Sequence, residues 1–422
     1  MKIPETSEPV RPSGRGAPDG AGAIAPAAPA TSVSAPVATS AATRPRLFTP
    51  GPVEIPSRVL QALSRVPPHH RTEEFRATLL EVTRRLRELH GTAGEVFLLA
   101  ASGTGAMEAA VVNLMSPRER ALVVTGGKFG ERWKSLLAAF GVPHETFEVE
   151  WGRAVDPADL ERALERDAAI TTVFATHSET STGALHDVQA LAGVARAHPA
   201  ASGAPRRVVV DAVTSLGVHP LVQDEWGIDV VVCGSQKGLM VPPGIATLSL
   251  APWAAESIGR GLPRYYFDLR KARASLPQGE TAFTPPVSLV LALEESLAMI
   301  REEGLQEVHA RHRRLAWAAR AGAQALGFRL FSSSPSHAVT ALLPPEGLEA
   351  AALVRRLRQR HGMVVAGGQD RLKGRILRIG HMGHYDLADL HALFGALEEC
   401  VAALGLPAEG ATAAATRAWD EA

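Results

Sequence analysis

The amino-acid sequence predicts an α/β protein with a mainly parallel sheet sandwiched by helices, followed by a smaller C-terminal α+β domain. From about residue 58 to 253, helical stretches alternate with short Val-rich apolar runs. These runs lack polar alternation, which is typical of strands that helices cover on both faces. After a Pro-rich connector over 277–286 the regular alternation ends, and a long helical stretch leads into the second domain.

Length, charge and cysteine content restrict the class of protein. The 422 residues include 44 Lys and Arg against 44 Asp and Glu, so neither a nucleic-acid footprint nor a polybasic membrane surface is indicated. Cys233 and Cys400 are the two cysteines, too few for a disulfide scaffold or a Cys-based structural zinc site. No apolar run approaches the roughly 18–20 residues of a membrane span. We therefore expect a soluble cytoplasmic protein of the size of an enzyme, and we assign no metal ligands.

Composition also predicts the limits of the domains. Residues 1–45 are rich in Ala, Pro and Ser and contain no aromatic residue, so we expect a disordered tail. An N-terminal arm and the large domain are expected over 46–303, and the small α+β domain over 304–406. Residues 407–422 are expected to form a second, shorter tail.

The periodicity assigns the elements in order. Predicted helices of the large domain cover 57–64, 73–89, 106–114, 133–140, 157–166 and 188–197. Predicted strands cover 96–100, 121–125, 171–175, 208–211, 230–233 and 245–250. After the Pro-rich connector we expect a helical stretch over 288–326 that spans the domain boundary, a strand at 338–343, a helix at 348–360, apolar runs at 363–366 and 376–379, and a helix at 387–404.

Ligands bind beyond the carboxyl ends of the strands in such a sheet, so the residues directly after each strand are the first candidates for a site. The first strand leads into Ala101-Ser102-Gly103-Thr104-Gly105 and then a helix. Small residues at this turn allow backbone N–H groups to approach an anion. The segment is neither a Walker loop nor a complete dinucleotide fingerprint, because no Gly-Lys comes after it and Glu108 replaces the third glycine. A tight structural turn explains it equally well.

Two further strands end in groups that suit one cofactor. Asp211 ends an apolar strand, where it acts either as a helix N-cap or as the partner of a cationic ring nitrogen. Lys237 comes after another strand among small residues, and burial there would lower its pKa as Schiff-base chemistry requires. A loop rich in hydroxyls comes after the strand at 171–175. A lysine, a carboxylate and an anion cradle together indicate pyridoxal 5'-phosphate.

The sequence at this point resembles a known family over roughly residues 46–405. It is similar to the class V, fold-type I pyridoxal-phosphate aminotransferases, in particular the alanine–glyoxylate and serine–pyruvate aminotransferase group. The markers, in chain order, are Thr49-Pro50-Gly51-Pro52, Ser102-Gly103-Thr104-Gly105, Ser178-Glu179-Thr180-Ser181-Thr182-Gly183, Asp211-Ala212-Val213-Thr214-Ser215, Gly234-Ser235-Gln236-Lys237 and Leu377-Arg378-Ile379-Gly380. Each marker alone is weak, but six in order are specific.

The resemblance implies roles for individual residues of the cofactor site. Lys237 corresponds to the Schiff-base lysine, and Asp211 to the partner of the pyridinium nitrogen. Val213 and Phe129 correspond to the residues on the two faces of the ring, although many members carry Trp at the position of Phe129. The remaining cofactor contacts that the resemblance implies are Thr180 by its hydroxyl, Ser102, Gly103, Thr104 and Gln236 at the phosphate, and Thr281 and Thr284 from the other subunit of a homodimer.

The resemblance also implies the reaction. Arg378 corresponds to the arginine that binds the substrate carboxylate, and the expected activity is a ping-pong transamination from alanine or serine to glyoxylate or pyruvate. An alternative is 2-aminoethylphosphonate–pyruvate aminotransferase, whose hydroxyl-rich loop is similar. A cysteine desulfurase-like lyase fits less well because it needs a mobile thiol, whereas Cys233 lies in a predicted strand and Cys400 in a predicted helix. A cofactor-free interaction protein would not need Lys237, Asp211 and Arg378.

Several histidines remain without an assigned role. His309 and His312 are expected on a solvated helix face, because arginines flank them. His381 and His384 come shortly after Arg378 and line either the site or a loop. His69 and His70 precede a helix for which the adjacent Thr72 is the expected N-cap.

Overall fold

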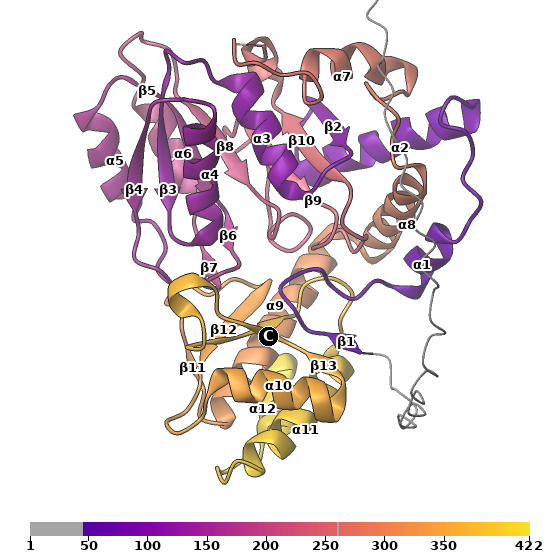
Figure 1. Ribbon diagram of the computed structural model, residues 1–422, viewed down its shortest axis with the longest axis vertical. Coiled ribbons are helices and arrows are strands. Elements are labelled where there is room, and N and C mark those ends of the chain that lie inside the picture. The colour runs from indigo at the N-terminus through magenta and orange to yellow at the C-terminus, as the bar shows by residue number, and fades with distance from the viewer. Residues whose placement is uncertain (1–44, 260) are drawn as a thin grey trace, which may run out of the picture. The chain divides into compact units, whose positions relative to one another are not determined.

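The structure is a computed structural model that describes residues 45–259 and 261–422 (Figure 1). The tail expected over 1–45 therefore lies almost wholly outside the described residues. Contacts join the described chain into one compact unit. The expected boundary between residues 303 and 304 stays a prediction.

A seven-stranded sheet forms the first part of the fold. Its strand order is β2 (Glu95–Leu99), β10 (Ala246–Leu250), β9 (Val230–Gly234), β8 (Arg207–Asp211), β5 (Ile170–Thr176), β3 (Arg120–Thr125) and β4 (His144–Glu148). β10 runs antiparallel to both neighbours, and all other pairs are parallel. This confirms the predicted mainly parallel sheet. The prediction missed β4, a half-buried edge strand in which Phe147 is the one apolar residue, so no apolar run marks it in the sequence.

Helices cover both faces of this sheet. They are α1 (Ser57–Leu63), α2 (Glu73–His90), α3 (Gly103–Leu114), α4 (Lys128–Ala139), α5 (Pro157–Arg166), α6 (Val188–Ala197), α7 (Leu269–Ser275) and α8 (Val287–Glu303). Val208 and Val210 of β8 join one hydrophobic cluster with α2, α5, α6 and α8, whereas Val209 joins the other with α3, α4 and α7 (Figure 1). Successive side chains of this buried strand point to opposite faces of the sheet, and each face is covered by its own layer of helices. None of the described helices is long and apolar enough to cross a membrane.

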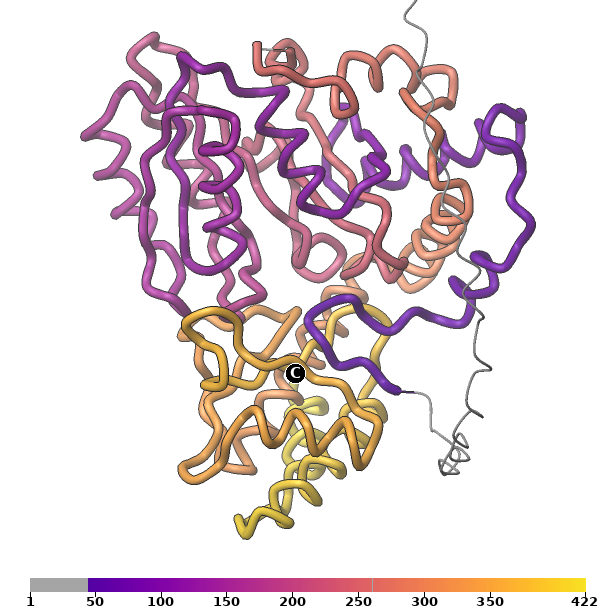
Figure 2. The backbone as a smooth tube through the Cα atoms, in the orientation of Figure 1, coloured from indigo at the N-terminus to yellow at the C-terminus, as the bar shows by residue number. Residues whose placement is uncertain are grey.

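The C-terminal part is built on a second, antiparallel sheet. Its order is β11 (Arg329–Leu330), β12 (Val339–Leu343), β15 (Leu377–Gly380) and β14 (Ala366–Gly367). The helices α9 (Leu305–Ala325), α10 (Ala350–His361) and α11 (Leu387–Ala402) pack with it around one hydrophobic cluster. The first described strand, β1 (Arg46–Leu47), pairs in parallel with β13 (Met363–Val364), so the start of the described chain lies beside this C-terminal part (Figure 2).

The structure refines one expectation for the C-terminal part and contradicts another. The stretch over 288–326 is helical as expected but consists of two helices, because Gly304 with φ of 89° and ψ of 129° separates α8 from α9. Residues 407–422 are not a tail, since they contain the helix α12 (Ala411–Asp420). Ala411 and Ala415, one turn apart, are buried in the same hydrophobic cluster as Phe394 of α11. Small alanine side chains allow this close packing. The same alanines make the segment look like a low-complexity tail when composition alone is considered.

Candidate active site

The site lies at the carboxyl ends of three neighbouring parallel strands. Thr176 at the end of β5 is paired with Asp211 at the end of β8, and Asp211 is paired with Val232 of β9. Lys237 lies three residues after the end of β9, and the first turn of α3 begins beside Gly234. The strand ends that the sequence singled out therefore converge.

Lys237 is buried, and its amine faces the backbone of the N-terminal segment. Nζ donates a hydrogen bond to the Pro50 carbonyl oxygen. A Cβ at Gly51 would overlap the Lys237 side chain, so this turn packs directly on the lysine. Burial lowers the pKa of Lys237 to about 8, with the charge of Arg378 the next cause. Near neutral pH a much larger fraction of this amine is therefore neutral and nucleophilic than of an ordinary lysine.

Asp211 is a second buried titratable group at these strand ends. Its Oδ1 accepts a hydrogen bond from the Val213 backbone N–H at 2.8 Å. Burial raises the pKa of Asp211 to about 7. A cationic group bound beside Asp211 would stabilise its ionised form and lower that pKa again. Asp211 is thus suited to hold a protonated nitrogen.

The first turn of α3 forms a cradle for an anion. The Ser102 side chain at the N-cap makes no capping hydrogen bond, and Gly103 lies so close to Val213 that a Cβ would be 2.7 Å from its Cγ2. The Gln236 side-chain oxygen is buried without a partner, so the hydrogen-bonding capacity of this amide is incompletely used. Together with the helix N-terminus at Thr104, these groups suit a phosphate.

A buried glutamate connects two walls of the site. Glu179 accepts hydrogen bonds from the backbone N–H groups of Phe129 at 3.0 Å and Gly130 at 3.1 Å. It also accepts from the N–H and hydroxyl of Ser181 at 3.0 and 2.6 Å. Glu179 therefore fixes the start of α4, which carries Phe129, against the loop that carries the buried Thr180.

Arg378 reaches the site from the C-terminal sheet. It lies on β15, where its Nε and Nη2 donate to the Gly367 carbonyl oxygen at 2.9 and 2.8 Å. Its Nη1 donates to the Thr180 carbonyl oxygen at 2.8 Å. Burial lowers the pKa of Arg378 to about 10, so the guanidinium stays charged at neutral pH. The three hydrogen bonds use three of its five N–H groups and leave two for a carboxylate.

Comparison with known proteins identifies the family. The family model described as aminotransferase class-V matches residues 47–380. The chain belongs to the class-V aminotransferases.

This aminotransferase chain has relatives with differing names. It is 43% identical over 364 residues to a protein named soluble hydrogenase, small subunit, from Synechococcus sp., a match that covers 85% of this chain and 93% of the relative. It is 35% identical over 366 residues to a serine–glyoxylate aminotransferase from Methylorubrum extorquens, covering 84% and 89%. The solved structure of an aspartate aminotransferase of subgroup IV from Thermus thermophilus superimposes with a TM-score of 0.79 at 37% identity, covering 85% and 99%. That structure supports the fold-type I architecture.

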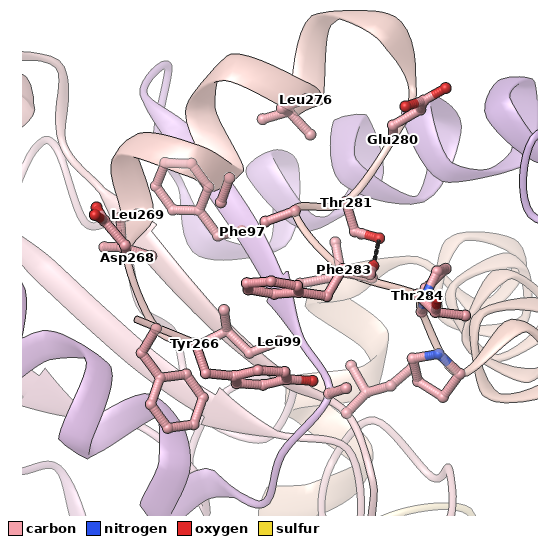
Figure 3. Close-up of a pocket in the computed structure, with 18 of the residues that line it drawn as sticks. Phe97, Leu99, Tyr266, Asp268, Leu269, Leu276, Glu280, Thr281, Phe283 and Thr284 are labelled. Carbon is pink, nitrogen blue, oxygen red and sulfur yellow. Dashed lines mark hydrogen bonds between the residues drawn. The ribbon is translucent and has the colours of Figure 1, made fainter. Parts of the chain in front are cut away.

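Thr281 and Thr284 lie apart from the other expected site residues of this aminotransferase. Both line a cavity of about 50 Å³ together with Tyr266 and Phe283, and none of the cradle residues lines it (Figure 3). Thr281 Oγ1 donates to the Phe283 carbonyl oxygen at 2.5 Å, as the dashed line in Figure 3 shows. A second cavity of about 500 Å³ adds His70 and Arg71 to the same threonines.

The two cysteines and two of the unassigned histidines are buried. Cys233 and Cys400 are both buried, and burial raises the pKa of each thiol. The solvated face expected for His312 is wrong, because its ring is buried and accepts from the Gly383 backbone N–H at 3.0 Å. His381 is buried with its Nε2 2.9 Å from the Thr340 hydroxyl, so it links β15 to β12.

The expected N-cap of α2 is confirmed. The Thr72 hydroxyl oxygen accepts a hydrogen bond from the Phe75 backbone N–H at 3.3 Å. His69 and His70, which precede this cap, lie against each other with ring centroids 4.4 Å apart and ring planes tilted by 34°. His70 therefore belongs to the cavity of Thr281 and Thr284 and not to the anion cradle.

Sequence reasoning missed two charged residues of the site. In the sequence Glu179 stands out only as part of a motif. Its position among hydroxyl-bearing residues after an apolar strand is the signal that could have identified it as a buried hydrogen-bond acceptor. Arg132 received no role, yet it lies three residues after Phe129, on the same face of α4. Both contribute to the electrostatics of Lys237 and Asp211.

The lowered pKa of Lys237 leads to a direct test on the ligand-free protein. Acetylation by acetic anhydride at a series of pH values should give a midpoint near pH 8 for Lys237, because only the neutral amine reacts. Ordinary lysines titrate near 10.4 and serve as internal controls in the same peptide map. Replacing the neighbouring cation by Arg378→Met should shift the midpoint upward. A midpoint for Lys237 near the ordinary value of about 10.4 would contradict a desolvated amine.

Proposed function

We propose that the chain is a pyridoxal-phosphate-dependent transaminase that moves an amino group from alanine or serine to glyoxylate or pyruvate by a ping-pong mechanism. The single observation that carries this proposal is the buried Lys237 amine, with its pKa lowered to about 8, among the charges of a buried carboxyl group and the Arg378 cation. The relative named for serine and glyoxylate supports the choice of small substrates.

The residues of the site fit the cofactor. Ser102, the Gly103–Thr104 backbone and the incompletely paired Gln236 amide would hold the phosphate. Val213 and Phe129 would flank the ring, and Asp211 would hold the proton on the ring nitrogen. The Thr180 hydroxyl, 3.5 Å from that of Thr214, would donate to the ring substituents. Pyridoxal phosphate, when bound, supplies the electron sink of the reaction.

The remaining chemistry belongs to side chains of this protein. Lys237 would hold the cofactor through its amine and, once the substrate amine replaces it, take the proton from the substrate Cα as general base. Its lowered pKa makes it a base suited to neutral pH. Arg378 would orient the substrate by binding the α-carboxylate with its two remaining N–H groups.

The substrate carboxylate favours this reaction over the alternatives. 2-Aminoethylphosphonate carries no carboxylate for Arg378, so we place its transamination with pyruvate second. A desulfurase would need a mobile thiolate, whereas both cysteines are buried with raised pKa values. The name of the hydrogenase relative does not alter the proposal, since redox metal clusters use several Cys thiolates and the two cysteines here belong to separate hydrophobic clusters.

A panel of amino donors tests the proposed reaction. Alanine or serine with glyoxylate should be turned over faster than 2-aminoethylphosphonate with pyruvate, and aspartate is included because a related structure carries that name. Arg378→Lys should raise KM for amino and oxo acids by about 10- to 100-fold, because an ammonium does not reproduce the bidentate contact. Arg371→Lys, an exposed arginine stacked on Trp151, is the matched control. Faster turnover of the phosphonate would instead support the alternative.

We further propose a homodimer with shared active sites. Thr281 and Thr284 line cavities that contain none of the cradle residues, so within one chain they have no evident ligand. In a dimer they would hydrogen-bond the phosphate held by the partner subunit, as the family resemblance implies. A hydrogen bond to a charged group contributes about 1.5–3 kcal/mol.

Mixing two impaired variants tests this arrangement. Thr284→Ala should weaken cofactor retention by about 10- to 100-fold, and Lys237→Ala should abolish turnover. In a mixed dimer with shared sites, the Thr284→Ala subunit supplies an intact Lys237 and the Lys237→Ala subunit supplies an intact Thr284 to the same site. Tight cofactor binding and activity should return at that site. Two different affinity tags on the variants allow the mixed dimers to be isolated, and equilibrium ultracentrifugation checks that they are dimeric. No recovery in mixed dimers, or a fully active monomer, would contradict shared sites.

A further inference from the structure

Arg132 is a partly buried cation at the edge of the anion cradle. Its Nη1 donates a hydrogen bond to the Thr104 hydroxyl oxygen at 2.8 Å. Its guanidinium carbon lies 4.7 Å from the centroid of the Phe129 ring, one turn earlier on α4. Among the described residues, no carboxylate forms an ion pair with Arg132. A partly buried cation without such a partner is stabilised when an anion binds nearby.

The hydrogen bond fixes the direction of the Thr104 hydroxyl. Because this oxygen accepts from Arg132, its own proton is free to be donated to another acceptor. Thr104 lies in the first turn of α3, beside Ser102, whose side chain makes no capping bond. The acceptor that this turn favours is an anion. Arg132 therefore polarises a donor at the cradle.

The charge of Arg132 also acts on the reacting groups. It lowers the pKa of Lys237 and that of Asp211, in each case as a smaller cause than burial. The charge of Arg132 is thus felt by both groups, although Arg132 lies on α4 and not at the strand ends. Its contacts with Thr104 and Phe129 connect the phosphate end of the site to the ring-stacking wall.

We propose that Arg132 is a positioning residue for the phosphate group of the cofactor, acting through the Thr104 hydroxyl and as the counter-charge of the anion. This rests on the proposed function, because the phosphate is that of pyridoxal phosphate. The same guanidinium holds the Phe129 ring, so one residue aligns the phosphate donor and the stacking surface. We therefore expect Arg132 to give selectivity for the phosphorylated cofactor over pyridoxal.

The experiment compares two ligands that differ only in the phosphate. Dissociation constants for pyridoxal phosphate and for pyridoxal are measured on three full-length, cofactor-free proteins. These are the wild type, Arg132→Gln and Arg132→Lys. Arg132→Gln should weaken pyridoxal phosphate by about 10- to 100-fold and pyridoxal by less than about threefold. Arg132→Lys keeps the charge and should recover part of the selectivity. Arg371→Gln, which also removes an arginine stacked on an aromatic ring, should change neither constant.

A double-mutant cycle with Thr104→Val separates positioning from general stability. The losses from Arg132→Gln and Thr104→Val should be less than additive for pyridoxal phosphate, because both remove the same oriented donor. Equal weakening of both ligands by Arg132→Gln and Arg132→Lys would show a merely structural role and overturn the inference. Unchanged binding of pyridoxal phosphate in Arg132→Gln would overturn it as well.

Inorganic phosphate distinguishes this inference from the proposed function. Its binding to the wild type and to Arg132→Gln is measured by calorimetry without any cofactor. A wild type that binds phosphate in an Arg132-dependent manner, but not pyridoxal phosphate, would refute the proposed function and leave the anion role of Arg132 supported. A wild type that binds neither would overturn both.

Discussion

The burial of one lysine amine is the constraint on which the site depends. Lys237 lies just after a central strand and has lost most of its contact with water, so its pKa falls to about 8. The segment that covers it, Pro50 and Gly51, is held from the C-terminal part of the chain. β1 pairs with β13, and the Gly380 backbone N–H donates to the Phe48 carbonyl oxygen at 2.7 Å. The C-terminal sheet therefore helps to set the chemistry of a lysine that follows a strand of the large sheet.

Strand β15 connects the expected carboxylate-binding residue to the turn that covers Lys237. Gly380 is two residues from Arg378 on β15, and a Cβ at Gly380 would overlap the Thr49 carbonyl group. Arg378 itself donates to the loop that carries Thr180. A path of hydrogen bonds and close packing thus connects the expected carboxylate-binding residue, the turn over Lys237 and the hydroxyl-bearing loop. This arrangement explains why the markers of the family are spread over most of the described chain.

The site combines cationic and acidic side chains, and their balance indicates which ligands it suits. The charges of Arg378 and Arg132 act on Lys237, as do the carboxyl groups of Asp211 and Glu179. Glu179 is satisfied by backbone and hydroxyl donors, and burial raises the pKa of Asp211 to about 7. The positive charges that remain suit a phosphate at one end and a carboxylate at the other. Two anionic ligands would complete the charge balance that the chain alone leaves open.

Sequence reasoning was most successful for the placement of residues that depends on local order. Lys237 and Asp211 come at the ends of continuous apolar strands, and parallel strands bring their ends together. It failed where a role depends on distant contacts, as for Arg132 and Glu179, whose partners lie on other segments. His312 was placed on the surface because of neighbouring arginines, yet its ring packs inward. The Ala-rich helix α12 was predicted to be a tail, since its burial depends on helices elsewhere in the chain.

Covalent trapping tests the central claim most directly, namely that Lys237 is the reactive amine of this site. The protein is incubated with pyridoxal phosphate, reduced with borohydride, digested and mapped by mass spectrometry. We predict one dominant pyridoxyl label, on Lys237, which disappears in Lys237→Ala while circular dichroism confirms that this variant is folded. A dominant label on another lysine, or equal labelling of the folded Lys237→Ala variant, would contradict this assignment.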